Sequence, residues 1–115
     1  MTPVALAAAQ LVAYNARDID AFCACFAEDV QVFDAHGAVT IDGIAAFRAA
    51  YADAFGAWEV FGAEVDRRDA AGDVVVDHER WWRSRGDERR EGRVRVTYTV
   101  MAGRIANVRF TPEAT

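Results

Sequence analysis

The sequence predicts an α+β fold in which three N-terminal helices pack on a curved, mostly antiparallel sheet to form a cone. Apolar residues recur at helical spacing up to residue 55, and they alternate at strand spacing after Gly56. Short turns separate the later segments, which is typical of consecutive hairpins. Helices followed by hairpins are the order of an α+β protein. A length of 115 residues suits one domain, so we expect a single domain spanning residues 1–115.

Each predicted helix begins at a side chain that can accept hydrogen bonds from its first amides. These capping residues are Thr2, Asp18 and Asp42. The first helix opens at Pro3 and ends at Asn15, and the third ends at Gly56. Two short strands, at 30–33 and 39–41, are expected between the second and third helices.

Four longer strands are expected after the helices, at 57–68, 73–84, 91–101 and 104–111. One face of the third of these strands is apolar and should meet the helices; it carries Val94, Val96, Tyr98 and Val100. The second strand has two mixed faces. One carries Val76, His78, Arg80 and Trp82, and the other carries Val75, Asp77, Glu79 and Trp81. We predict that the first of these faces points inward, because it starts apolar, ends aromatic and holds no pair of acids.

Composition excludes several classes of protein. The net charge of −5 does not favour nucleic-acid binding, and no apolar run approaches the ~20 residues of a membrane span. The N-terminus lacks the pattern of a secretory signal. Cys23 and Cys25 cannot pair on one helix, so we expect buried thiols in a reducing cytoplasm. All thirteen basic residues are arginine, which suggests a GC-rich, bacterial genome.

Segments along most of the chain carry a family resemblance: 14–22 (YNARDIDAF), 26–30 (FAEDV), 42–43 (DG), 47–51 (FRAAY) and 103–106 (GRIA). They resemble the nuclear transport factor 2-like superfamily, which includes ketosteroid isomerases and SnoaL-like polyketide cyclases. The resemblance implies a cone of curved sheet and three helices, usually dimeric through the outer face of the sheet. The resemblance says less about activity, because proteins of one fold carry out many different functions.

The resemblance also implies site residues. Asp34 corresponds to the general base of the isomerases, and Tyr51 corresponds to a supporting tyrosine. Their two oxyanion-hole donors correspond to Gln10 and Val96, so we do not expect steroid isomerisation. The row of strand 73–84 that faces the pocket in the family corresponds to Val76, His78, Arg80 and Trp82.

We therefore predict three catalytic residues: Asp34 as base, His78 as a second acid or base, and Arg80 as a stabiliser of negative charge. If Arg80 touches Asp34, that pair is structural and His78 is the better base. The predicted pocket lining comprises Gln10, Tyr14, Phe22, Phe47, Tyr51, Phe61, Trp82, Val96, Tyr98, Val108 and Phe110. No cofactor is expected, and a metal site of Asp34, His36 and His78 lacks a spacing signature.

Each candidate has a structural alternative. Asp34 can instead cap the turn that precedes Gly37. His78 can be a hydrogen-bonded residue within the sheet, and Arg80 can form surface ion pairs. An outward Trp81 beside the Arg/Thr face of 91–101 predicts a homodimer.

The predicted function is that of a small-molecule pocket protein. Its activity would be that of a cofactor-independent isomerase, dehydratase or cyclase, working by proton transfer on a hydrophobic carbonyl or hydroxyl compound. The alternative is a non-catalytic dimeric module of the same fold that binds a ligand or serves a structural role.

Overall fold

Residues 1–113, which the structure describes, form three helices and one six-stranded sheet in the computed structural model. The helices are α1 (Pro3–Asn15), α2 (Ile19–Cys23) and α3 (Ile44–Ala57). The strands are β1 (Phe26–Phe33), β2 (Val39–Asp42), β3 (Val60–Ala71), β4 (Val74–Arg85), β5 (Glu88–Met101) and β6 (Arg104–Glu113). The strand order is β2-β1-β6-β5-β4-β3, in which β1 and β6 run parallel and all other neighbours run antiparallel.

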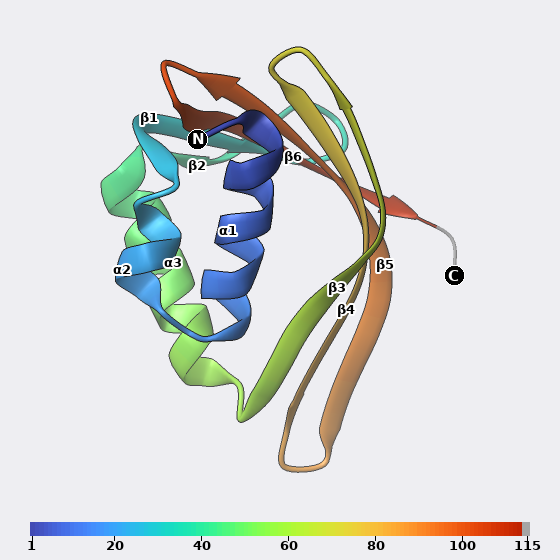
Figure 1. Cartoon of the computed structure of the whole chain (residues 1–115). Helices are drawn as coiled ribbons and strands as arrows, with labels where there is room; N and C mark the ends of the chain where they lie inside the picture. The colour runs from blue at the N-terminus through green and yellow to red at the C-terminus, as the bar shows by residue number, and fades with distance from the viewer. Residues whose placement is uncertain (114–115) are drawn as a thin grey trace.

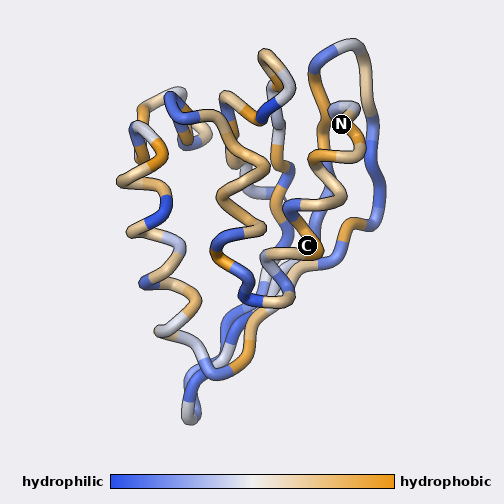
Figure 2. The backbone as a smooth tube through the Cα atoms, turned by 60° about the vertical axis from the view of Figure 1, so that its left-hand side comes forward, coloured by the Kyte–Doolittle hydropathy of each residue, from blue (hydrophilic) through white to orange (hydrophobic). Residues whose placement is uncertain are grey.

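The helices gather on the concave side of the sheet, and the long strands β3, β4 and β5 curve around α1 (Figure 1). This arrangement confirms the predicted α+β cone. The tube in Figure 2 is mostly hydrophobic along α1 and hydrophilic at the β4–β5 hairpin below it. The largest fully buried side chains are Phe22, Phe47, Ile105, Val30, Val75, Val96 and Asp77. Within residues 1–113, no helix combines the length and apolar character that a membrane crossing requires.

Two of the three predicted caps are present. Thr2 and Asp18 each accept a hydrogen bond of 3.1 Å from the backbone amide three residues further on. The prediction that Asp42 caps α3 is wrong. Gly43 holds the capping position with φ +88°, and no side chain of the described residues caps this helix. Asp42 still belongs to β2 and accepts a hydrogen bond of 3.3 Å from Gln31, so it lies one residue too early to reach the helix amides.

The register between β4 and β5 decides which face of β4 meets the helices. Cross-strand partners of an antiparallel pair share a face. Asp77 pairs with Val96, and Glu79 pairs with Val94, so both acids lie on the face that β5 buries against the helices. The odd-numbered residues of β4 therefore point inward.

The predicted inward face of β4 is consequently wrong, and His78, Arg80 and Trp82 lie on the outer face. The physical cause is the length of the hairpin. It closes over two residues, with Gly86 at φ +52°, and Arg85 pairs directly with Glu88. A register that differs by one residue exchanges the two faces of a strand.

Two tryptophans cover glycines on opposite sides of the sheet. A Cβ atom on Gly92 would come within 2.9 Å of the inward Trp81 ring, and one on Gly62 would come within 2.6 Å of the outward Trp82 ring. Each ring thus lies directly over the backbone of a neighbouring strand. The prediction that Trp81 is exposed on the outer face is wrong, because the register places it toward the helices.

Side chains at the end of α1 attach the helices to the edge strand β3. The Asn15 amide donates to the Ala63 carbonyl at 3.0 Å and accepts from the Ala63 amide at 2.9 Å. Arg17 donates to three carbonyls at the α3–β3 junction, those of Phe55, Trp58 and Glu59. These bonds fix the side of the cone on which β3 approaches α1.

Candidate functional site

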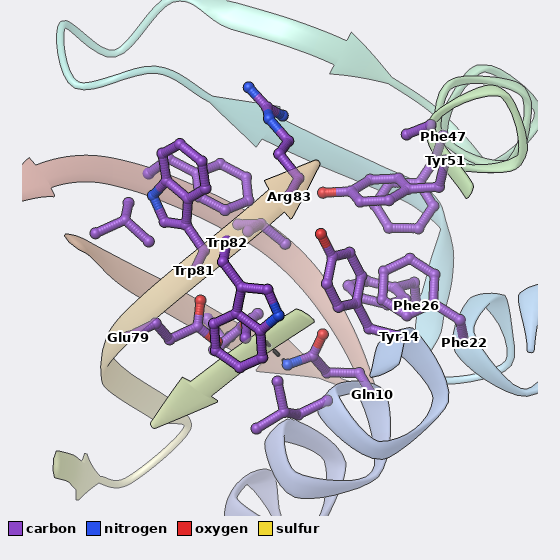
Figure 3. Close-up of a pocket in the computed structure, with 17 residues that line it drawn as sticks. Gln10, Tyr14, Phe22, Phe26, Phe47, Tyr51, Glu79, Trp81, Trp82 and Arg83 are labelled. Atoms are coloured by element: carbon purple, nitrogen blue, oxygen red, sulfur yellow. Dashed lines mark hydrogen bonds between the residues drawn. The ribbon is translucent and has the colours of Figure 1, made fainter. Parts of the chain in front are cut away.

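A cavity of about 280 Å³ lies between the helices and the concave face of the sheet (Figure 3). Aromatic side chains dominate its walls: Tyr14, Phe22, Phe26, Phe47, Tyr51, Trp81, Tyr98 and Phe110. Trp82 also borders the cavity, although its side chain lies on the outer face of the sheet. Helical spacing explains part of this wall, because Phe47 and Tyr51 are four residues apart and share one face of α3. Three polar side chains join the lining, namely Gln10, Glu79 and Arg83.

Glu79 is the acidic group of the cavity. The residue is 7% exposed, and within residues 1–113 no hydrogen bond or ion pair involves its carboxyl group. Burial raises the pKa of Glu79 to about 7, with a smaller rise from nearby Asp77 and an opposing effect from Arg68. At neutral pH this carboxyl group exists in both protonation states, so it can donate or accept a proton.

Asp77 lies beneath Glu79 on the same face of β4 and has a dedicated partner. Its side chain is fully buried, and the Arg68 guanidinium of β3 donates to both carboxylate oxygens, at 2.6 Å and 3.0 Å. Such bidentate pairs are strong and fixed in geometry. The pair holds a negative charge close to Glu79, and Arg68 offsets part of that charge.

Three tyrosines from three elements approach Glu79. Burial raises the pKa of Tyr14, Tyr51 and Tyr98, and the charge of Glu79 raises it further. All three hydroxyls therefore stay protonated near neutral pH and can serve as donors. The Tyr98 hydroxyl accepts a hydrogen bond of 2.9 Å from Gln10. In Figure 3, Tyr14 and Tyr51 enter from the helices, opposite the strand that carries Glu79.

Arg83 is the basic group of the lining. Its guanidinium lies 5.0 Å from the centre of the Trp81 ring and 4.9 Å from that of Trp58. Among residues 1–113, no carboxylate forms an ion pair with it. The site thus combines an aromatic cavity, one titratable acid and one cation without an acidic partner.

The structure does not bring the three sequence-predicted catalytic residues into this cavity. Asp34 lies in a turn, where it accepts hydrogen bonds of 2.9 Å and 3.0 Å from the amides of His36 and Ala38. These backbone bonds lower the pKa of Asp34. Asp34 therefore has the contacts that the alternative role in a turn requires, and it is held as a carboxylate.

His78 and Arg80 lie on the opposite side of the sheet from the cavity. The His78 ring contacts Glu113 at 3.1 Å and Asp69 at 3.6 Å. Arg80 pairs with Glu64 at 3.1 Å and lies 5.1 Å from the centre of the Trp82 ring. Arg80 does not pair with Asp34, so the contact considered from the sequence is replaced by surface ion pairs.

Most of the predicted lining residues do border the cavity: Gln10, Tyr14, Phe22, Phe47, Tyr51, Trp82, Tyr98, Val108 and Phe110. Trp82 also borders a second hollow near the β4–β5 hairpin. Phe61 instead packs beside the cavity wall, with its ring centre 5.0 Å from that of Tyr14. Val96 is fully buried without reaching the cavity. Sequence reasoning missed Glu79, Trp81 and Arg83.

Comparisons with known proteins agree with this architecture. Residues 7–108 match the family model described as a SnoaL-like domain, whereas no curated protein matches the chain. An uncharacterized cystatin-fold protein from Novosphingobium aromaticivorans superimposes with a TM-score of 0.88 and 24% identity, covering 96% of this chain and 98% of its own. An LEH-like epoxide hydrolase from M. tuberculosis has a TM-score of 0.85 and 20% identity, covering 96% and 82%. TerC, co-crystallised with polyporic acid, has a TM-score of 0.80 and 15% identity, covering 96% and 91%.

Proposed function

Because this chain belongs to the SnoaL-like domain family, we propose that it is an enzyme that transfers a proton to or from a small hydrophobic molecule in its cavity. The Glu79 carboxyl group is the acid and base of this proposal. Solved structures of similar fold include an epoxide hydrolase and a protein co-crystallised with polyporic acid. Those two proteins work on or hold small organic molecules, which supports the same use of the cavity in this chain.

One observation carries the proposal: an acid with a pKa of about 7 lies in an aromatic cavity without a bonded partner among residues 1–113. Proton transfer is most efficient when the pKa of the catalytic group lies near the working pH. Structural carboxylates usually have a cation or backbone amides beside them, as Asp77 and Asp34 do. Within residues 1–113 Glu79 bonds to neither, since Arg68 acts on it only through its charge, and this favours a role toward a ligand over a role in stability.

The neighbours of Glu79 define the chemistry it can perform. Ionised Glu79 can remove a proton from a carbon beside a carbonyl group, and the protonated form can return that proton at another position. The hydroxyls of Tyr14 and Tyr51 stay protonated and can donate to the oxygen on which negative charge develops. The Arg68–Asp77 pair is a positioning pair, because it fixes the strand beneath Glu79 and supplies the charge that helps to raise its pKa.

The test measures proton transfer without the natural substrate. A hydrophobic ketone such as 1-indanone is incubated with the protein in D₂O, and exchange of its α-protons is followed by NMR. We expect the wild type to accelerate exchange over buffer, with a rate that rises through an inflection near pH 7. The ionised carboxylate is the base, which fixes the direction of this change.

Glu79→Gln keeps the shape of the side chain and removes its titration, so the acceleration should disappear. Asp34→Asn and His78→Gln are matched controls, because both residues lie outside the cavity, and both variants should retain the wild-type rate. No acceleration by the wild type, or full acceleration by Glu79→Gln, would overturn the proposal. Loss of acceleration in either control variant would return the catalytic role to the residues predicted from the sequence.

A further inference from the structure

We propose that Arg83 binds an anionic oxygen group of the ligand at the rim of the cavity, so that the preferred ligand is a small planar aromatic acid. This inference rests on the proposed function, because it assigns the polar end of a molecule whose apolar body occupies the same cavity. It adds a residue and a ligand class that the proton-transfer proposal does not require.

The position of Arg83 distinguishes it from the other arginines of its strand. Arg83 lies on the inward row of β4 with Glu79 and Trp81, and it contributes to the cavity lining. Arg80 and Arg85, its neighbours along β4, have carboxylate partners in Glu64 and Glu88, respectively. Within residues 1–113 Arg83 has none, so its charge is available to a ligand.

The surroundings of Arg83 prepare it for an anion. Its guanidinium lies over two indole rings, those of Trp58 and Trp81. Contacts of this kind use the flat faces of the guanidinium and restrict its motion. The N–H groups at its edge stay free, and their fork matches the two oxygens of a carboxylate.

The remaining charges of the cavity permit an anion below pH 7. The titratable and charged groups around Glu79 are Asp77 on β4, Arg68 on β3, Tyr14 on α1, Tyr51 on α3, Tyr98 on β5 and Arg83. Asp77 and Arg68 neutralise each other, and the three tyrosines are uncharged. With Glu79 protonated, Arg83 is then the remaining charge of the lining that residues 1–113 form. Once Glu79 ionises, its carboxylate repels an anionic ligand.

The volume and the aromatic lining of the cavity determine the size and shape of the apolar part of the ligand. A volume of about 280 Å³ lies at the lower end of the roughly 300–1,000 Å³ of small-molecule sites. Aromatic rings line it from both the helices and the sheet, and such rings favour offset or edge contacts with flat aromatic molecules. A small aromatic molecule with a carboxylate at one end can pack against the aromatic walls and bind Arg83 at the rim.

The test compares 2-naphthoate with its neutral counterpart 2-naphthylmethanol by isothermal titration calorimetry at pH 6. We expect the wild type to bind the acid about tenfold more tightly, as a charge-assisted bond at a partly exposed site provides. Arg83→Gln should bind both probes with equal affinity. Arg85→Gln is the matched control, since Arg85 also lies over Trp58 but outside the cavity, and it should keep the preference.

A second readout uses pH. Between pH 6 and pH 8 the wild type should lose affinity for naphthoate, whereas Glu79→Gln should not. Equal binding of both probes by the wild type, a preference retained by Arg83→Gln, or no binding of either probe would overturn this inference. Ketone exchange that persisted in those cases would leave the proposed proton transfer standing. An intact preference for the acid without any ketone exchange would instead overturn the proposed proton transfer alone.

Discussion

Asp77 and Glu79 lie two residues apart on the same face of β4, and Arg68 binds Asp77 rather than Glu79. The two carboxyl groups therefore differ in environment although they share a strand and a face. Asp77 is fully buried and is bonded through both oxygens, whereas Glu79 reaches the cavity. Asp77 links β4 to β3 through Arg68, whereas Glu79 is free to interact with a ligand.

The first prediction concerns Glu79 and stability. Its pKa is about 7 in the fold against an ordinary 4.5, so between these values the folded protein holds one more proton than the unfolded chain. The free energy of unfolding must then fall as pH rises through this window, by roughly 3 kcal/mol as an upper bound. Glu79→Gln removes this loss. Urea denaturation of both proteins should show the variant gaining stability relative to the wild type from pH 5 to pH 7.5.

Other carboxyl groups do not disturb that comparison. Those of Asp34, Asp69 and Glu88 have lowered pKa values, so they lose stabilising interactions only as pH falls below their ordinary range. They are present in both proteins and cancel in the difference. Parallel stability profiles across this pH range would contradict the assignment.

The second prediction concerns the pair beneath Glu79. Arg68→Met leaves the buried Asp77 carboxylate without its partner, and we expect a loss of about 3–5 kcal/mol in the free energy of unfolding. Arg67→Met is the control one residue earlier. Arg67 pairs with Asp69 at the surface, so its loss should cost less than about 1 kcal/mol. Similar midpoints of urea unfolding for the two variants would show that the buried pair is not structural.

The third prediction separates a real cap from an apparent one. Asp18 caps α2 with a bond to the Ala21 amide, so Asp18→Ala should destabilise the protein by about 1 kcal/mol. Asp42 makes no bond to the amides of α3, so Asp42→Ala should cost less than about 0.5 kcal/mol. Thermal unfolding of the two variants is the measurement. A larger loss for Asp42→Ala would reverse the assignment.

The fourth prediction is a homodimer through the outer face of the sheet. The helices cover one face, while the other carries half-buried Val74, Val76 and Trp82 beside Thr97 and Thr99. We expect sedimentation velocity at micromolar concentration to give twice the mass of one chain. Val76→Glu places a charge in the middle of this face and should yield monomers. A wild type that sediments at the mass of one chain would rule the interface out.

The sequence predicts the helices and the sheet well because both rest on local periodicity. Val94, Val96, Tyr98 and Val100 alternate without ambiguity, and the structure buries that face. The part of the cavity wall that α3 supplies could be predicted from the sequence for the same reason. A helical face is set by spacing alone and needs no partner strand.

The polar part of the site could not be found in the same way. Both faces of β4 are mixed, so only the register with β5 decides between them. The turn predicted from the sequence, at 84–88, does not decide which residue of β4 pairs with which residue of β5. The observed turn at Gly86 and Asp87 fixes that register, because it pairs Arg85 with Glu88. A shift of one residue in this register would place His78, instead of Glu79, on the face toward the cavity. The structure places Asp34 outside the cavity for another reason. Two backbone amides of its own turn donate hydrogen bonds to its carboxylate.

The bonds between Asn15 and β3 have a consequence for how this protein behaves at high concentration. β3 is an edge strand, and an unpaired edge can recruit a strand from another molecule and begin aggregation. The Asn15 side chain occupies both the amide and the carbonyl of Ala63, the two groups that an incoming strand would use there. A single carboxamide thus substitutes for a neighbouring strand at that point, and an incoming strand cannot pair with β3 at Ala63 without displacing it.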